Sequence, residues 1–174
     1  QVEYTKKSRN WYMPHRFYSL DFGSILRVVA FDSIFPDFCF LSSHCAVDYL
    51  KKMTGDHQQK WTLALGHYPL ASASKKGSNY TGDTPVARYL RSSLCHKVDY
   101  WLSGHSHHLE HRKLPGCRLE TMVIGGGGGT LEEVNTKSRE ANFIKLDYGF
   151  VQMDITEDKM ISTLKDKNIK VLSY

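Results

Sequence analysis

Short apolar runs separated by polar turns recur along this chain, and their spacing predicts strands more often than helices. Residues 17–22 alternate between apolar and polar positions and residues 25–31 are rich in branched apolar side chains, with Gly23 between them, which predicts two paired strands. Residues 60–65 and 97–102 are apolar runs that predict buried strands. Later runs predict antiparallel strands at 109–114, 118–124, 150–155 and 160–164.

Two segments carry apolar residues at helical spacing. Ser43 can cap a helix over residues 44–53 that Gly55 ends, and Thr84 can cap a second helix over residues 85–94, which opens with proline. Strands that alternate with helices in this way predict parallel pairing through crossovers. Functional sites of such α/β folds form at the carboxyl ends of the strands.

Four stretches lack a regular pattern. Residues 1–16 mix polar and aromatic side chains and predict a covering segment without regular structure. Residues 35–41 predict an irregular apolar loop, and residues 72–82, small and polar, predict a surface loop. Residues 125–129 are five consecutive glycines, which can serve either as a flexible linker or as a backbone that approaches a ligand closely.

Composition narrows the functional classes. The chain has 174 residues and a formal charge of +5, with its lysines and arginines scattered, which favours small anionic ligands over a nucleic-acid groove. The chain contains no run of about 18 apolar residues, so no membrane span is predicted. The four cysteines show no CxxC spacing, so a zinc ribbon or redox motif is not expected. The cysteines permit two disulfides, although Cys95 can equally be a buried thiol. A glycosylation sequon at Asn79 favours a secreted protein.

Histidines follow two of the predicted strands. The strand at 60–65 leads into Gly66-His67, and the strand at 97–102 leads into Gly104-His105-Ser106-His107-His108. Residues two apart in an extended backbone point the same way, with α-carbons about 6–7 Å apart. His105 and His107 can therefore face one site, or two metal ions about 3.5–4 Å apart, whereas His108 points away. Histidines alone could be incidental, but two strands that each end in Gly-His at the same edge indicate a site.

These motifs resemble those of a known family. The segments Trp11-Tyr12-Met13-Pro14, Gly66-His67-Tyr68-Pro69 and Gly104-His105-Ser106-His107 resemble the later motifs of calcineurin-like metallophosphoesterases, in particular the purple acid phosphatases of the tartrate-resistant type. The resemblance implies an α/β fold, part of a four-layer αββα sandwich with a mixed sheet and crossover helices followed by antiparallel strands. It also implies that residues 1–174 are the C-terminal portion of a single metallophosphoesterase domain, because the family's earlier motifs are absent from this chain.

The resemblance further implies a dinuclear metal centre of iron plus iron, zinc or manganese. In the family pattern His107 binds the ferric ion, and His67 and His105 bind the second metal. The substrate would be a phosphomonoester, and the protein would belong to the secretory pathway, a lysosome or the extracellular space. The carboxylate, tyrosine and Asn-His ligands of the family are missing here, so the chain alone is expected to hold no metal or a partial set and to be inactive.

Three functions remain open at this stage. The first is a metal-dependent acid phosphatase in the full-length protein, and the second is a phosphatase-like scaffold that has lost catalysis and binds partners. The third is a hydrolase with one metal held by three histidines, complete as it stands. Retention of His67, His105 and His107 favours the phosphatase. No oligomeric state is predicted.

Overall fold

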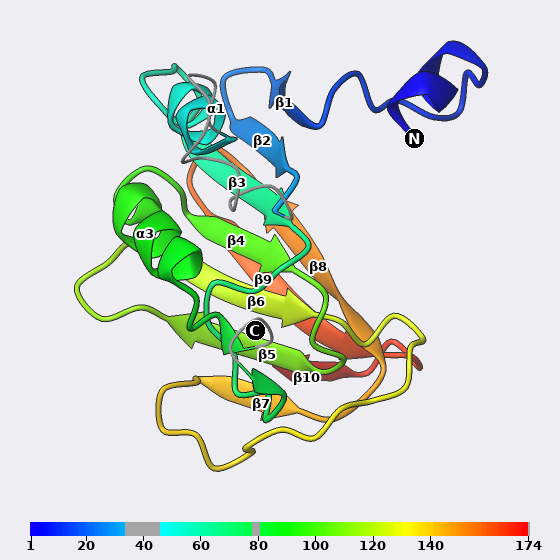
Figure 1. Ribbon diagram of the computed structural model, residues 1–174, viewed down its shortest axis with the longest axis vertical. Coiled ribbons are helices and arrows are strands. Elements are labelled where there is room, and N and C mark those ends of the chain that lie inside the picture. The colour runs from blue at the N-terminus through cyan, green and yellow to red at the C-terminus, as the bar shows by residue number, and fades with distance from the viewer. Residues whose placement is uncertain (34–45, 78–80, 174) are drawn as a thin grey trace.

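The computed structural model in Figure 1 describes residues 1–33, 46–77 and 81–173. A seven-stranded mixed sheet lies at its centre, in the order β1-β2-β3-β4-β6-β5-β7. Strands β2, β3, β4 and β6 run parallel, and β1, β5 and β7 each pair antiparallel with a neighbour. The strands are β1 (Phe17–Phe22), β2 (Leu26–Phe31), β3 (Trp61–Gly66), β4 (Tyr100–Ser103), β5 (Leu109–Lys113), β6 (Glu120–Ile124) and β7 (Phe143–Lys145).

The predicted hairpin at 17–31 is confirmed by β1 and β2, which pair in register from Phe17↔Phe31 to Phe22↔Leu26. The predicted antiparallel pairing of the later strands is confirmed for β5 and β6, but the parallel neighbour of β6 was not predicted. This strand pairs antiparallel with β5 but lies parallel to β4, so it is inserted between β4 and β5. Neither β7 nor β10 (Val171–Ser173) was expected, and each is only three residues long.

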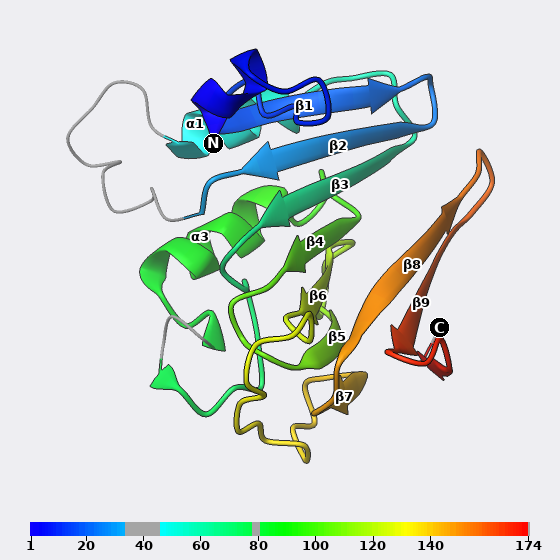
Figure 2. The same ribbon diagram turned by 90° about the vertical axis from the view of Figure 1, so that its right-hand side faces the viewer.

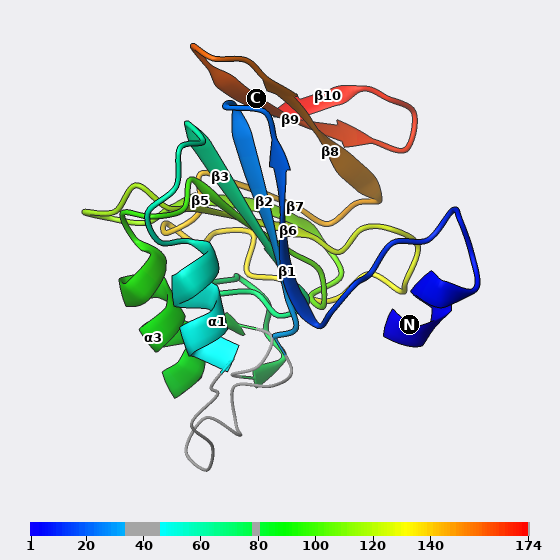
Figure 3. The same ribbon diagram turned by 90° about the horizontal axis from the view of Figure 1, so that it is seen from above.

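Two helices cover one face of the large sheet, as Figures 2 and 3 show. They are α1 (Ala46–Met53) and α3 (Pro85–Leu94), and the predicted cap of α3 is confirmed because Thr84 Oγ1 accepts a hydrogen bond of 3.0 Å from the Ala87 amide. The proposed cap of α1, Ser43, and the apolar loop at 35–41 lie outside the described residues. Beneath the helices is the main core, formed by Val29, Phe31, Leu50, Ala64, Leu70, Ala87, Leu90, Leu94, Val98, Trp101 and Leu119.

A smaller antiparallel sheet covers part of the opposite face (Figure 3). It contains β8 (Gly149–Ile155), β9 (Met160–Asp166) and β10. Its inward side chains pack on Leu63, Tyr100 and Met122 of the large sheet. These inward side chains include Val151, Met153, Ile155 and Met160. The described chain therefore forms three layers, helices on a mixed sheet on a smaller sheet, and no described helix covers the outer face of the smaller sheet.

The N-terminal segment is partly regular, contrary to expectation. Residues Val2–Lys6 form a 3₁₀ helix with no buried residue, and Trp11 and Tyr12 remain exposed. The Thr5 hydroxyl donates to the Met13 carbonyl at 3.0 Å and accepts from the Met13 amide at 2.9 Å. These two bonds fold the segment back on itself, and the 3₁₀ helix projects away from the large sheet (Figure 1).

The structure decides between the two alternatives for Cys95 and corrects part of one predicted loop. Cys95, at the end of α3, forms a disulfide with Cys117, with α-carbons 5.1 Å apart, so Cys95 is not a buried thiol. The predicted surface loop at 72–82 is wrong in its first part, because Ser72, Ala73 and Ser74 are all buried. Cys39, Cys45 and Asn79 lie outside the described residues. Among those described, no helix is long and apolar enough to cross a bilayer.

Candidate functional site

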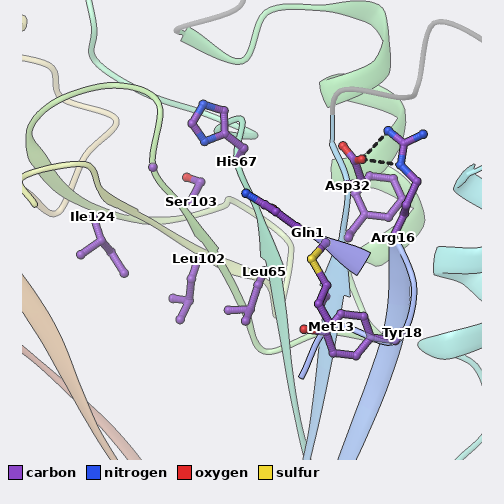
Figure 4. A pocket seen from close by; sticks show the side chains of 14 residues that line it. Gln1, Met13, Arg16, Tyr18, Asp32, Leu65, His67, Leu102, Ser103 and Ile124 are labelled. Atoms are coloured by element: carbon purple, nitrogen blue, oxygen red, sulfur yellow. Dashed lines mark hydrogen bonds and ion pairs between the residues drawn. The ribbon is translucent and has the colours of Figure 1, made fainter. Parts of the chain in front are cut away.

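The carboxyl ends of β3 and β4 bring two of the predicted histidines together. Gly66 and Ser103 are paired in register, and the Gly104 amide donates to the His67 carbonyl at 3.2 Å. His105 Nδ1 then lies 3.0 Å from His67 Nε2, with ring centroids 4.9 Å apart and the rings edge to face. Figure 4 shows His67 at the edge of the adjoining pocket. The turn occurs at His105 itself, which has φ of 61°, a conformation that is uncommon outside glycine.

This pair is suited to bind a cation. Two nitrogens that each lie about 2.0–2.1 Å from one ion are about 3 Å apart when they occupy adjacent positions around it. Burial lowers the pKa of His105, and the neighbouring His67 lowers it further, although Glu132 opposes the shift. His105 therefore favours its neutral form, which is the form that ligates metals.

His107 is held by a different part of the chain. Its Nδ1 lies 2.7 Å from the Thr130 carbonyl and 3.7 Å from Glu132 Oε1, and its own carbonyl accepts from the Glu132 amide at 3.2 Å. The side chain is 36% exposed. Among the described residues, no three or more His, Cys, Asp or Glu side chains are close enough to hold a metal ion together. The structure thus pairs His67 with His105 and holds His107 against the loop that contains the glycine run.

The glycine run is not a flexible linker over most of its length. A Cβ on Gly125 would lie 1.9 Å from the Ser106 carbonyl oxygen, and one on Gly129 would lie 2.7 Å from the His107 ring, whereas one on Gly127 would meet nothing within 4 Å. The close approach expected of these glycines is therefore made to the histidine loop of the protein itself.

Two charged residues near His107 were missed by the sequence analysis. Glu132 is nearly buried, with its side chain 4% exposed, and its Oε1 lies 2.8 Å from Lys76 Nζ. Burial would raise the pKa of Glu132, but the hydrogen bond from Lys76 and the proximity of His107 lower it overall. Lys76 lies in the loop that follows His67, and nothing in the local sequence marks Glu132 as buried.

A buried polar cluster lies behind the histidine loop. His108 is fully buried, and its Nε2 is 2.7 Å from Glu110 Oε2, which also accepts from the Ala73 amide at 2.8 Å. Glu110 Oε1 accepts from Arg112 Nε. Burial would raise the pKa of Glu110, but the His108 hydrogen bond and the Arg112 charge lower it overall. This cluster ties the segment after His67 to the strand that follows the histidine loop, and it explains why Ser72–Ser74 are buried.

The remaining histidines are not brought into the site. His111 Nε2 bonds Glu120 Oε2 at 2.5 Å with a side chain 15% exposed, so it does not face solvent freely. His57 bonds the Thr62 hydroxyl, and His15 and His96 are exposed. His44 lies outside the described residues.

A cavity of about 640 Å³ adjoins His67. Leu65, Leu102 and Ile124 of the large sheet form much of its wall, and Met13 from the N-terminal segment lies across from them (Figure 4). At its rim Arg16 pairs with Asp32 at 2.5 Å. Leu65 is 37% exposed, so the uncovered part of this sheet face is apolar next to the histidine pair.

Comparisons with known proteins agree with the motifs. No family model matches the sequence. Human tartrate-resistant acid phosphatase type 5 is 24% identical over 99% of this chain and 60% of that protein, and purple acid phosphatase 3 of Arabidopsis thaliana is 26% identical over 58% of this chain and 28% of that protein. This chain therefore spans about 60% or less of the length of these relatives.

Solved structures share the fold. A purple acid phosphatase from yellow lupin seeds matches with a TM-score of 0.73 and 21% identity, over 90% of this chain and 31% of that chain. GAP50, described as the anchor in the inner membrane complex of Plasmodium, matches with a TM-score of 0.70 and 17% identity, over 94% of this chain and 54% of that chain. The expected α/β metallophosphoesterase-type fold is confirmed, and so is the resemblance to purple acid phosphatases over nearly the whole chain.

Proposed function

We propose that these 174 residues are the C-terminal portion of a metallophosphoesterase domain, and that the full-length protein hydrolyses phosphomonoesters as an acid phosphatase. The observation that carries the proposal is the contact of His67 Nε2 with His105 Nδ1 at 3.0 Å. The similarity to human tartrate-resistant acid phosphatase over 99% of this chain supports the same reaction class.

Two metal ions, iron plus iron, zinc or manganese, would complete the site. The donors in this chain fit part of it: His67 and His105 would hold one ion, and His107 would contribute to the other through Nε2, because its Nδ1 faces the Thr130 carbonyl. Such ions supply Lewis acidity at phosphate oxygens and a nucleophile derived from water. We propose that the carboxylate ligands come from residues outside this chain.

The side chains of this chain would prepare the site for that chemistry. Burial lowers the pKa of His105, and this shift is in the direction of the neutral imidazole that can ligate a metal. The cluster around Glu110 fixes the backbone on both sides of the histidine loop. Lys76 pairs with Glu132 at 2.8 Å, and this ion pair would hold the loop beside His107 in place.

We also propose that the protein resides in the secretory pathway, a lysosome or the extracellular space. The disulfide between Cys95 and Cys117 supports this location, because such bonds persist in oxidising compartments.

The second candidate is a scaffold without catalysis. Its support is the similarity in fold to Plasmodium GAP50, which is described as an anchor. Three retained histidines, two of them in contact, favour the phosphatase instead.

The test uses the full-length protein and two variants. His105→Ala removes one of the paired nitrogens and should abolish most hydrolysis of p-nitrophenyl phosphate and lower the metal content per chain. His96→Ala, an exposed histidine at the far end of the strands, should leave both unchanged. Wild-type protein with neither bound metal nor phosphatase activity would establish the scaffold and refute the enzyme.

A further inference from the structure

Three residues of one loop, Gly129, Thr130 and Glu132, lie against the His107 ring. Gly129 lies so close that a Cβ would be 2.7 Å from the ring. The Thr130 carbonyl lies 2.7 Å from Nδ1, and Glu132 Oε1 lies 3.7 Å from the same atom. Within residues 1–33, 46–77 and 81–173, the polar contacts of the ring are at Nδ1. Because a carbonyl can only accept, this contact requires the proton to be on Nδ1.

The carboxylate of Glu132 is held in this position by burial and by Lys76. The carboxylate is nearly buried, and its Oε2 is buried with no hydrogen-bond partner in the part of the chain that the structure describes. A buried carboxylate oxygen without a partner costs free energy, which indicates that a role other than local stability keeps it there. Lys76 holds the other oxygen at 2.8 Å.

Backbone pairing between two loops anchors the segment that directly follows Glu132. Ser74 and Val134 form an isolated antiparallel bridge, the Lys75 amide donates to the Glu133 carbonyl at 3.1 Å, and the Asn135 amide donates to the Ala73 carbonyl at 2.8 Å. The segment after His67 and the segment after the glycine run are thus joined beside His107.

We propose that Glu132 is a positioning residue for His107. With the Thr130 carbonyl, it holds the imidazole in the tautomer with the proton on Nδ1 and leaves Nε2 as the nitrogen available to a metal ion. The inference rests on the proposed function in that it treats His107 as a ligand. Glu132 is not itself a ligand in this scheme, since it lies on the Nδ1 side of the ring. Carboxylates and carbonyls that orient a ligating histidine commonly change metal affinity by about 10- to 100-fold.

The chain offers a matched control in the next residue. Glu133 has the same charge and pairs with Lys75 at 3.5 Å, but its side chain is 82% exposed. Glu132→Gln keeps the shape and an acceptor for Lys76 while removing the charge beside His107. Glu133→Gln removes an equal charge from the same pair of loops without touching the ring.

The first measurement is the tautomer of His107 in the wild-type chain, from imidazole ¹⁵N chemical shifts at alkaline pH without metal. The Nδ1-protonated form is expected, and the Nε2-protonated form would overturn the proposal even if no variant folded. The second is Zn²⁺ titration of the full-length protein, followed at the His107 ring. Glu132→Gln should weaken Zn²⁺ binding about 10- to 100-fold and Glu133→Gln should not. Equal effects of the two variants would also overturn it.

The same data separate this inference from the proposed function. If His107 has its proton on Nδ1 and Glu132→Gln mobilises the ring while Glu133→Gln does not, the positioning role stands. If in addition Zn²⁺ perturbs none of His67, His105 and His107 in the full-length protein, the metal-dependent phosphatase fails while the positioning of His107 remains.

Discussion

At the residue scale, Glu110 is a buried side chain whose carboxylate contacts two buried charged or polar partners. Glu110→Gln would leave Arg112 and His108 buried without the carboxylate that both contact. Removing one member of a buried charge pair costs about 3–5 kcal/mol, so urea unfolding should show a loss of that order. Glu140→Gln is the control: Glu140 also pairs with Arg112, but its side chain is 83% exposed, and a loss below about 1 kcal/mol is expected. Similar losses in the two variants would contradict this account.

Also at the residue scale, the sequence identified the histidines that meet but not the acids around them. His67 and His105 are predictable because each follows an apolar strand, and parallel strands end at the same edge of a sheet. Glu110 and Glu132 are not predictable in this way, because glutamate is rarely buried and their partners, Ala73 and Lys76, are distant in sequence. The disulfide partner of Cys95 cannot be predicted from the local sequence either, because Cys117 lies 22 residues away.

At the element scale, the glycine run acts as a close-packed connection rather than a hinge. Gly125→Ala would place a methyl group 1.9 Å from the Ser106 carbonyl oxygen, and Gly127→Ala would place one in open space. We expect the first to cost about 1–3 kcal/mol by overpacking and to displace the histidine loop, and the second to stay within about 0.5 kcal/mol of wild type. Thermal unfolding of both variants, with His105 and His107 resonances as reporters, measures this. An undisturbed histidine loop in Gly125→Ala would contradict it.

Local pattern also explains which elements were predicted and which were not. Helix α3 was found at its true bounds because Thr84 and Pro85 encode its start. Strand β6 was found, but not its place, because insertion between β4 and β5 depends on long-range pairing that no local pattern contains. The surface loop predicted at residues 72–74 is wrong because small polar side chains are typical of loops. Here Ser72 and Ala73 are buried and donate hydrogen bonds to the buried Glu110 carboxylate.

At the scale of the whole molecule, the isolated chain should be a poor catalyst. By the resemblance, the carboxylates and the proton donor of the family site are not among these 174 residues, and no described group of three or more ligating side chains is assembled. We expect little or no hydrolysis of p-nitrophenyl phosphate by the chain alone, with or without added Zn²⁺ or iron. Robust turnover that a chelator abolishes would mean that the site is complete as it stands.

The whole molecule should also lose stability in acid, in two stages. Burial lowers the pKa of His57 and of His105 below their ordinary value of 6.5, with Arg27 and His67 adding to the respective shifts. Burial would raise the pKa of Glu110 and Glu120, but their partners lower both below 4.5. For each group the unfolded chain therefore binds protons at a higher pH than the folded chain does, so the free energy of unfolding falls as the pH falls.

The histidines should contribute a first decline below about pH 6.5, and the glutamates a second below about pH 4.5. Urea unfolding at a series of pH values in metal-free buffer measures both stages. Glu110→Gln, already less stable at neutral pH, should show a shallower second decline because it no longer carries the buried carboxylate. A free energy of unfolding that is constant or rises on acidification would contradict the buried, paired state of these groups.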